Sequence, residues 1–402
     1  MDNKKTKLSI FIFFMVMFVI GTDTFLISPL LPTLSVIYDI PQSISGWMVS
    51  AYAIGYALFA LVAGPISDNL DRKKVMCTGL IFFSISTCLC GVATSFPMMI
   101  ICRLCAGISA SFVTPQMWGS IPVLVKPNEI VKAMSYVSAG LFIAQLLGVP
   151  IGGYLAALTW HVPFFVIGIA AMLLMFTVIF VLPDIKRPDT QKEKLSIVNI
   201  YSTLFKTPNS IKYYLAYLIF QTGTFTAYTF LGTWFTTTFG LSVSGVGTAM
   251  MVIGLGNTIG SLFGINITKR IGETKMLLLT IIISAILYCV LPFSPNLMIA
   301  EIILFVLFLC GGCLLPILMA LMQSLSSTAR GTVSALSNAT MYAGTSLGGV
   351  LSGILFTSLN GFYGVSFFTA LVYVIALLIY SSSRIFKYKS IQESIKPVNS
   401  NN

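Results

Sequence analysis

Apolar residues occur along this chain in long runs separated by short polar segments. An α-helix needs about 20 apolar residues to cross the hydrocarbon core of a bilayer. By that measure the pattern predicts spans at 8–36, 45–66, 76–95, 97–118, 133–157 and 163–183, and then at 211–236, 245–266, 276–293, 297–322, 332–357 and 362–382. The sequence therefore predicts an all-α membrane protein with twelve transmembrane helices in two groups of six.

One long polar stretch, residues 184–210, separates the two groups of spans. We expect it to be a cytoplasmic linker between an N-terminal six-helix bundle at 1–183 and a C-terminal six-helix bundle at 211–382. Residues 383–402 would then form a cytoplasmic tail.

The composition excludes a soluble protein, because 56% of the 402 residues are hydrophobic and 9% are charged, against about 25% charged residues in an average soluble domain. The apolar run that begins at Leu8 is too long for the core of a signal peptide, so we expect a retained first span. The eight cysteines all lie in apolar runs, which argues against an extracellular disulfide framework.

The net charge of +11 would suit an acidic partner such as nucleic acid, but the distribution of the charges favours a membrane protein. If the N-terminus is cytoplasmic, every lysine and arginine except Arg103 falls in a segment predicted to be cytoplasmic. Positive residues are retained on the cytoplasmic side during insertion. The pattern therefore predicts that both termini are cytoplasmic, with the lipid bilayer as partner and no nucleic acid.

The two halves of the sequence resemble each other. Ser45-Gly46 at the start of the second span recurs as Ser244-Gly245 at the start of the eighth, and Gly152-Gly153 in the fifth recurs as Gly348-Gly349 in the eleventh. Parallel six-span repeats are a transporter architecture, with the substrate site between the repeats near the bilayer midplane.

The loop between the second and third spans, residues 64–74, resembles the signature loop of the major facilitator superfamily. The residues that match the family pattern are Gly64, Asp68, Arg72 and Lys73. The sequence departs from the pattern at Asn69 and Asp71. In that family the loop is a charged latch on the cytoplasmic side, so the resemblance implies a gating role for the four matching residues.

Further matches indicate the branch of the family. Arg103 with Gly107 resembles the intramembrane arginine motif, and residues 148–153 and 21–25 resemble motifs of proton-linked drug and sugar exporters. The proline in residues 148–153 stands one position later than in multidrug antiporters, as in the arabinose-efflux-like branch. The resemblance implies the major facilitator fold and drug:proton antiport.

Three ionisable residues are predicted inside the membrane: Asp23, Arg103 and Glu301. A lone charge at the bilayer centre costs about 3 kcal/mol on insertion scales, so each should be paired or hydrated. The predicted depths of Asp23 and Arg103 permit a pair between them. Such a pair could couple transport to protons, or it could simply hold two helices together. Glu301 lies about one turn from the end of its span, where it could be hydrated.

The seventh span carries a polar and aromatic stripe at helical spacing, formed by Tyr217, Gln221, Thr224 and Tyr228. We expect this stripe to line a cavity and bind the substrate, the alternative being packing between helices with satisfied hydroxyl groups. Asn257, Asn338 and Gln145 are weaker candidates of the same kind.

Gly148, Pro150 and Gly152 in the fifth span predict a helix hinge, because proline lacks the backbone donor and small residues let helices approach closely. No metal site is expected. The Cys-x-x-Cys pairs at 102–105 and 310–313 lie in apolar spans, and His161 has no histidine partner. No cofactor is expected either, since the chain has no Gly-x-x-x-x-Gly-Lys loop for ATP.

Together these features predict a secondary transporter, not an enzyme, in the bacterial cytoplasmic membrane. It would export a small organic molecule in exchange for protons by alternating access, and a monomer is expected. A proton-coupled uptake symporter of the same fold is the nearest alternative, and a membrane sensor or scaffold without transport is the alternative from another class. The sequence does not identify the substrate.

Overall fold

The computed structural model describes residues 3–69, 71–126, 129–183, 202, 204–325 and 330–383, and this part of the chain is helical without strands. The N-terminal helices are α1 (Asn3–Ile37), α2 (Gln42–Ser45), α3 (Trp47–Asn69), α4 (Arg72–Gly91), α5 (Phe96–Leu124), α6 (Ile130–Ile143), η2 (Ala144–Gly148), α7 (Val149–Leu158) and α8 (Val162–Val181). The C-terminal helices are α10 (Ser210–Phe239), α11 (Val243–Ala249), α12 (Met251–Ile271), α13 (Glu273–Val290), η3 (Leu291–Phe293), α14 (Leu297–Gln323), α15 (Arg330–Ser358) and α16 (Phe362–Ser382).

Each of the twelve predicted spans corresponds to helix in the described residues, although the second, fifth, eighth and ninth are each built from consecutive helices. Eleven spans are long and apolar enough to cross a membrane by length and composition. The span that falls short is α10, which is rich in threonine. Because α10 packs against α1, α15 and α16 and most of its side chains are buried, most of its polar groups face neighbouring helices.

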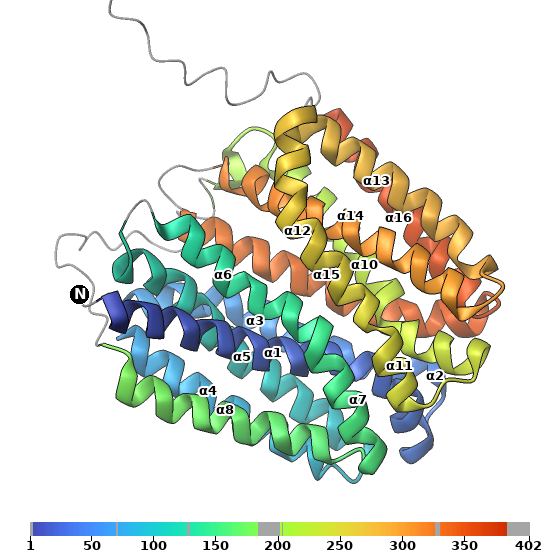
Figure 1. Ribbon diagram of the computed structural model, residues 1–402, viewed down its shortest axis with the longest axis horizontal. Helices are drawn as coiled ribbons and strands as arrows, with labels where there is room; N and C mark the ends of the chain where they lie inside the picture. Colours follow the sequence, from blue (N-terminus) through green and yellow to red (C-terminus); the bar gives the residue numbers. More distant parts are fainter. Residues whose placement is uncertain are drawn as a thin grey trace, which may run out of the picture.

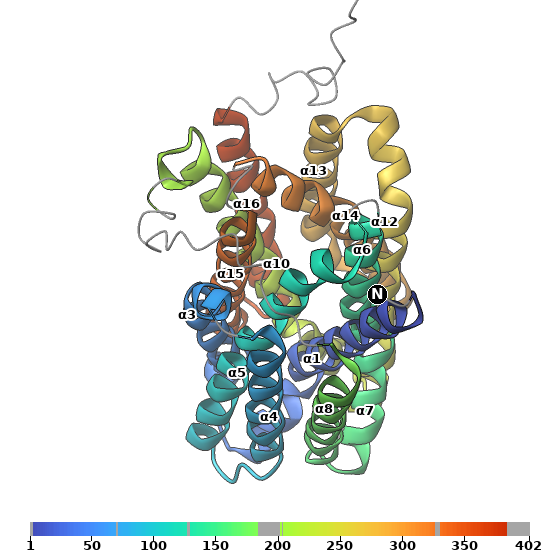
Figure 2. The same ribbon diagram turned by 90° about the vertical axis from the view of Figure 1, so that its left-hand side faces the viewer.

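The helices form two groups, each with its own hydrophobic core. In Figure 1 the N-terminal group, blue to green, lies below the C-terminal group, yellow-green to red, and Figure 2 shows the molecule turned by 90°. We call the end that carries Arg72, Lys126 and Arg270 the basic end. The first helix, α1, begins at this end, near the N label in Figure 1. The opposite end, which has no lysine or arginine in its loops, is the base-free end.

The two groups of helices meet toward the base-free end through pairs of glycines. A Cβ atom at Gly46 would overlap the carbonyl oxygen of Gly349, so α3 and α15 touch backbone to backbone. Gly153 and Gly247 make the equivalent close approach between α7 and α11. Gly46, Gly153 and Gly349 belong to the glycine motifs that the two halves share, whereas Gly247 lies two residues after the repeated Gly245. The repeat seen in the sequence therefore corresponds to a two-fold-like pattern of packing.

Hydrogen bonds between the groups reinforce this closure. The Ser50 hydroxyl donates to the Ser346 carbonyl oxygen at 2.7 Å. The Ser28 hydroxyl lies 2.7 Å from the Tyr228 carbonyl oxygen, to which it also donates. Both serines are buried. The described structure is therefore closed between its halves at the base-free end.

The fifth span is irregular where the sequence predicts a disturbance. A π-helical turn, η2, separates α6 from α7 and ends just before Val149-Pro150. Gly148 packs on the Thr22 side chain, and Gly152 packs on Leu26 of α1. π-Turns inside α-helices often mark functional positions. The irregular geometry is present, and the hinge role of Gly148, Pro150 and Gly152 stays a prediction.

The predicted linker lies largely outside the described residues, as does the predicted tail from residue 384 onward.

The closure at the base-free end predicts opposite outcomes for two repeated glycines. Gly46→Ala adds a methyl group where the Gly349 carbonyl stands, so the halves must separate there. Hydrogen exchange of residues 42–50 and 346–353 should rise several-fold in this variant. Gly245→Ala is the matched control, because its Cβ would meet nothing closer than a side-chain atom at 3.3 Å. Equal exchange in the two variants would contradict this account of the closure.

The irregular fifth span predicts a kinetic effect for Pro150→Ala. Alanine restores a backbone donor and favours a regular helix. Insertion and yield should therefore stay normal, while exchange between the two conformations slows several-fold. The measurement is the transport rate per inserted molecule, with Pro163→Ala in the first turn of α8 as the control. A transport rate unchanged in Pro150→Ala would argue against the hinge.

Candidate functional site

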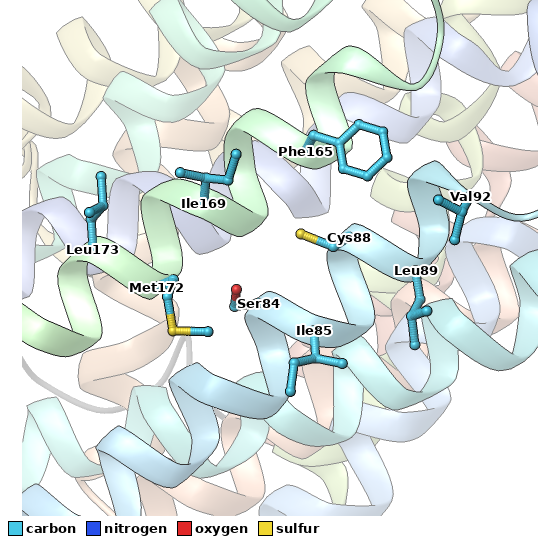
Figure 3. A pocket seen from close by; sticks show the side chains of 9 residues that line it. All are labelled: Ser84, Ile85, Cys88, Leu89, Val92, Phe165, Ile169, Met172 and Leu173. Carbon is cyan, nitrogen blue, oxygen red and sulfur yellow. The ribbon is translucent and has the colours of Figure 1, made fainter.

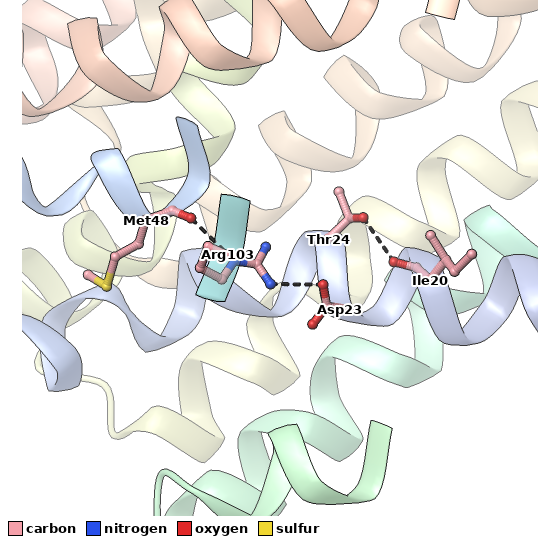
Figure 4. A network of polar contacts seen from close by, with 5 residues as sticks. All are labelled: Ile20, Asp23, Thr24, Met48 and Arg103. Carbon is pink, nitrogen blue, oxygen red and sulfur yellow. Dashed lines mark hydrogen bonds and ion pairs between the residues drawn. The ribbon is translucent and has the colours of Figure 1, made fainter. Parts of the chain in front are cut away.

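A buried ion pair lies between α1 and α5. The Arg103 Nη1 atom donates to Asp23 Oδ2 at 2.8 Å, as Figure 4 shows. Both residues are 1% exposed. The pair that the predicted depths permit is therefore present in the structure.

Two further contacts hold the guanidinium group in place. The Arg103 Nε atom donates to the Met48 carbonyl oxygen at 3.3 Å (Figure 4). The guanidinium carbon also lies 4.6 Å from the centre of the Tyr52 ring, which is a cation–π contact. These contacts require α3 and α5 to be close, and Gly107 permits this because its Cβ position is filled by the Tyr52 backbone. The arginine motif thus combines a charge with the glycine that allows the close approach.

Only one of the two carboxylate oxygens of Asp23 has a hydrogen-bond partner among the described residues. Its Oδ1 atom is buried and has no hydrogen-bond partner among the described residues, and the same holds for the Tyr52 hydroxyl. Buried polar atoms without a partner are rare in folded proteins and call for an explanation. The neighbouring Thr24 hydroxyl donates at 2.9 Å to the Ile20 carbonyl oxygen of its own helix (Figure 4). Asp23 Oδ1 is therefore an acceptor to which a proton could add.

Tyr52, which contacts Arg103, belongs to a group of three packed tyrosines, and we call Tyr52, Tyr56 and Tyr342 the tyrosine cluster. Tyr56 of α3 and Tyr342 of α15 stack with ring centres 3.7 Å apart. Tyr52 and Tyr342 have ring centres 6.3 Å apart. The sequence patterns described above do not indicate this cluster. Its only signal is the pair of tyrosines four residues apart, at 52 and 56, within an apolar span.

Glu301 lies apart from this site. It is half-buried near the start of α14, a helix that packs on α12 and α13 in the C-terminal group. The structure therefore does not bring the third candidate for proton coupling to the ion pair.

The stripe on the seventh span is placed within helix packing. Gln221 Nε2 donates to the Tyr217 hydroxyl at 3.1 Å. The Thr224 hydroxyl lies 2.8 Å from that of Tyr373, and the Tyr228 hydroxyl donates to the Phe25 carbonyl oxygen at 3.4 Å. All four residues of the stripe thus have hydrogen bonds within the protein, which favours the packing alternative in this conformation. Their role in substrate binding stays a prediction.

Two of the weaker candidates form a contact between the halves. Asn257 Nδ2 donates to Gln145 Oε1 at 2.7 Å, and both side chains are buried. Gln145 belongs to the π-turn η2, which therefore meets α12 at a polar group. Asn338 on α15 is half-buried and makes none of the hydrogen bonds found in the described chain.

The predicted gating loop is described only in part. The Arg72 guanidinium donates to the Gly119 carbonyl oxygen, and Lys73 Nζ donates to the Leu182 carbonyl oxygen at 2.6 Å. Both acceptors belong to the N-terminal group. Gly64 and Asp68 lie in the last turns of α3, and their environments fall outside what the structure describes.

Two apolar grooves lie on the outer surface of the bundle and include none of these residues. One, of about 470 Å³, runs between α4 and α8 and is lined by residues such as Ile85 and Phe165 (Figure 3). The other, of about 590 Å³, runs between α15 and α16. Their apolar linings suit contact with lipid tails. No group of histidine, cysteine and acidic side chains suited to a metal occurs in the described residues.

Comparison with known proteins agrees with this architecture. The family model described as Major Facilitator Superfamily matches residues 13–231 and 213–394. The chain is 48% identical over 373 residues to the uncharacterized MFS-type transporter YceJ of Bacillus subtilis, covering 93% of this chain and 95% of that protein. It is 28% identical to multidrug resistance protein 2 of the same organism, covering 82% of this chain and 84% of that protein.

Among solved structures, the D-xylose-proton symporter superposes with a TM-score of 0.79 at 14% identity, covering 92% of this chain and 96% of that structure. This likeness shows the shared fold. The family match spans both halves of the sequence, in agreement with the two groups of helices and their repeated glycine contacts. The chain therefore belongs to the major facilitator superfamily and is a multi-pass membrane transporter of small molecules, not an enzyme.

Proposed function

We propose that this protein exports a small organic molecule in exchange for protons by alternating access. The observation that carries the proposal is the buried Asp23–Arg103 pair, in which one carboxylate oxygen has no partner. Charged residues inside a membrane are costly and mark ion and substrate pathways.

The chemistry of the pair suits proton coupling. With Asp23 ionised, the pair is neutral overall and each charge compensates the other. Addition of a proton at Oδ1 leaves Arg103 as an uncompensated buried cation, which is unfavourable unless the surroundings change. Proton binding and release therefore favour different environments of the site. Alternating access provides different environments, because the site faces one side of the membrane and then the other.

Export is supported by the relative at 28% identity that is named as a multidrug resistance protein, and by the resemblance of the first and fifth spans to exporter motifs. An uptake symporter of the same fold is the second candidate. The superposition on a sugar symporter supports the fold alone and does not favour uptake. A sensor or scaffold without transport has no feature in the described chain to support it.

The charge pattern supports an orientation with the basic end and both termini in the cytoplasm. In that orientation the closure at the base-free end shuts the site from the outside. Transport would proceed by rocking of residues 1–183 against residues 211–382, with the linker and tail on the cytoplasmic side. The predicted stripe on α10, together with Asn257 and Asn338, would contact substrate once the halves rearrange.

Asp23→Asn tests the proton-coupling role. The amide keeps the size of the side chain but cannot carry the proton, so gradient-driven efflux should fall to background while substrate binding persists. Efflux is measured in cells and binding on purified protein, with a compound found by an accumulation screen. Glu301→Gln is the matched comparison, because it neutralises an acid on another helix that lies apart from the pair.

Asp23→Asn also leaves Arg103 without its charge partner, and this could reduce folding. The double variant Asp23→Asn/Arg103→Gln removes both charges and should recover the yield but not the coupling. Undiminished uphill efflux by either variant would refute proton coupling through Asp23.

The direction of the two fluxes separates the candidate functions. In proteoliposomes with an imposed pH gradient, an antiporter moves the screened compound against the direction of proton flow. A symporter moves both in the same direction, and a sensor binds the compound without any flux. We expect opposite fluxes. Parallel fluxes would establish the uptake alternative, and Asp23→Asn vesicles supply the background rate.

A further inference from the structure

The ion pair lies in the N-terminal group, yet one side chain of the tyrosine cluster next to it comes from the C-terminal group. Tyr342 is on α15 and is counted in the hydrophobic core of the N-terminal group, together with Tyr52 and Tyr56. It is 8% exposed. It therefore reaches across the boundary between the halves and packs inside the opposite group.

The contacts of Tyr342 lead to the ion pair in two steps. Its ring stacks on Tyr56 at 3.7 Å between centres, and it lies 6.3 Å from the ring of Tyr52. Tyr52 in turn lies against the Arg103 guanidinium. The ring thus packs on the two tyrosines of α3, one of which contacts the ion pair, from the side of the C-terminal group.

Movement of the two halves must move this cover. Tyr342 belongs to α15, whose Gly349 and Ser346 meet Gly46 and Ser50 of α3 at the base-free end. When α3 and α15 separate there, the Tyr342 ring has to leave Tyr56. The separation would uncover Tyr52, and with it the ion pair.

We propose that Tyr342 is the occluding residue of the Asp23–Arg103 site, a side chain from one half that seals the charges of the other half and links their access to water to the rocking of the halves. This inference rests on the proposed proton coupling at Asp23. It assigns to Tyr342 a positioning role, because the tyrosine carries no proton itself. The stacked ring excludes water from the buried Asp23 carboxyl group until the two halves separate.

The size of the ring gives the role a physical basis. A water molecule occupies about 30 Å³ in the liquid, so truncation of a tyrosine to alanine leaves room for several waters. The site offers these waters the partners that they need, since Asp23 Oδ1 and the Tyr52 hydroxyl are unpaired in the described structure. Hydration of Asp23 without movement of the halves would let protons cross without substrate.

The test uses the full-length protein in liposomes and protons alone as the probe. After an imposed pH step, the rate of proton entry without substrate is read from a pH-sensitive dye trapped inside. Tyr342→Ala should raise this leak several-fold, whereas Tyr342→Phe keeps the ring and should match the wild type. Tyr363→Ala is the control, because Tyr363 is an exposed tyrosine at the base-free end of the same half, in contact with Phe293.

If Tyr342→Ala gives too little folded protein, Tyr342→Leu keeps an apolar side chain without the ring and should leak in the same way. A leak at wild-type level in the folded alanine or leucine variant would overturn the assignment. So would a phenylalanine variant that leaks as much as alanine, because the ring would then not be the seal.

A different variant tests the proposed proton coupling independently of the occluding role. Asp23→Asn in the wild-type background reports whether the acid couples transport at all. Lost coupling in Asp23→Asn with a tight Tyr342→Ala variant refutes only the occluding role. Intact coupling in Asp23→Asn refutes proton coupling at Asp23, and with it the basis of this inference.

Discussion

A charge buried in a membrane protein must be paired, and it must be kept from water until the protein needs it exposed. The Asp23–Arg103 pair imposes both requirements on this fold. The pairing is met locally, because α3 and α5 come together through Gly107, and α1 adds the carboxylate. A carboxylate, a backbone carbonyl and a tyrosine ring thus surround one guanidinium group. The exclusion of water is met at long range, since Tyr342 arrives from the other half of the chain.

The glycine pairs that close the base-free end explain how a ring from one half can reach the other. Gly46 with Gly349 and Gly153 with Gly247 bring helices of the two halves into backbone contact. The same two helices, α3 and α15, continue side by side beyond this contact, and there Tyr56 and Tyr342 stack on each other. The closure and the cover of the acid are therefore parts of one interface. A substitution that separates Gly46 from Gly349 is therefore expected to weaken the stacking of Tyr56 on Tyr342 as well.

The sequence predicted the helices well because length and hydropathy are local properties. The least clear-cut span by composition, α10, buries most of its polar side chains against other helices. The ion pair was predictable because two opposite charges at matching depth have few other partners. The tyrosine cluster was not, since tyrosines are common in such spans and the contact joins residues 56 and 342. The stripe on α10 was ambiguous for a related reason. Helical spacing identifies a face, but it does not say whether a cavity or a neighbouring helix covers that face.

The two repeats share the same pattern of glycine contacts, which we call the frame, but the polar side chains around this frame differ. Gly148 and Gly152 pack on α1 at Thr22 and Leu26, and Gly344 and Gly348 pack on α10 around Gln221 and Thr226. In the first repeat this frame surrounds an aspartate paired to an arginine. In the second it surrounds neutral polar groups that bond to each other, such as Gln221 and Tyr217.

The acid lies in one half, and a tyrosine packed next to its site comes from the other, so movement of the halves changes how the two are placed. Because Asp23 and Tyr342 belong to different halves, protons reach Asp23 more readily in one conformation than in the other. We infer that the asymmetry, built on a symmetric frame, is what allows a conformational change to act on a single acid.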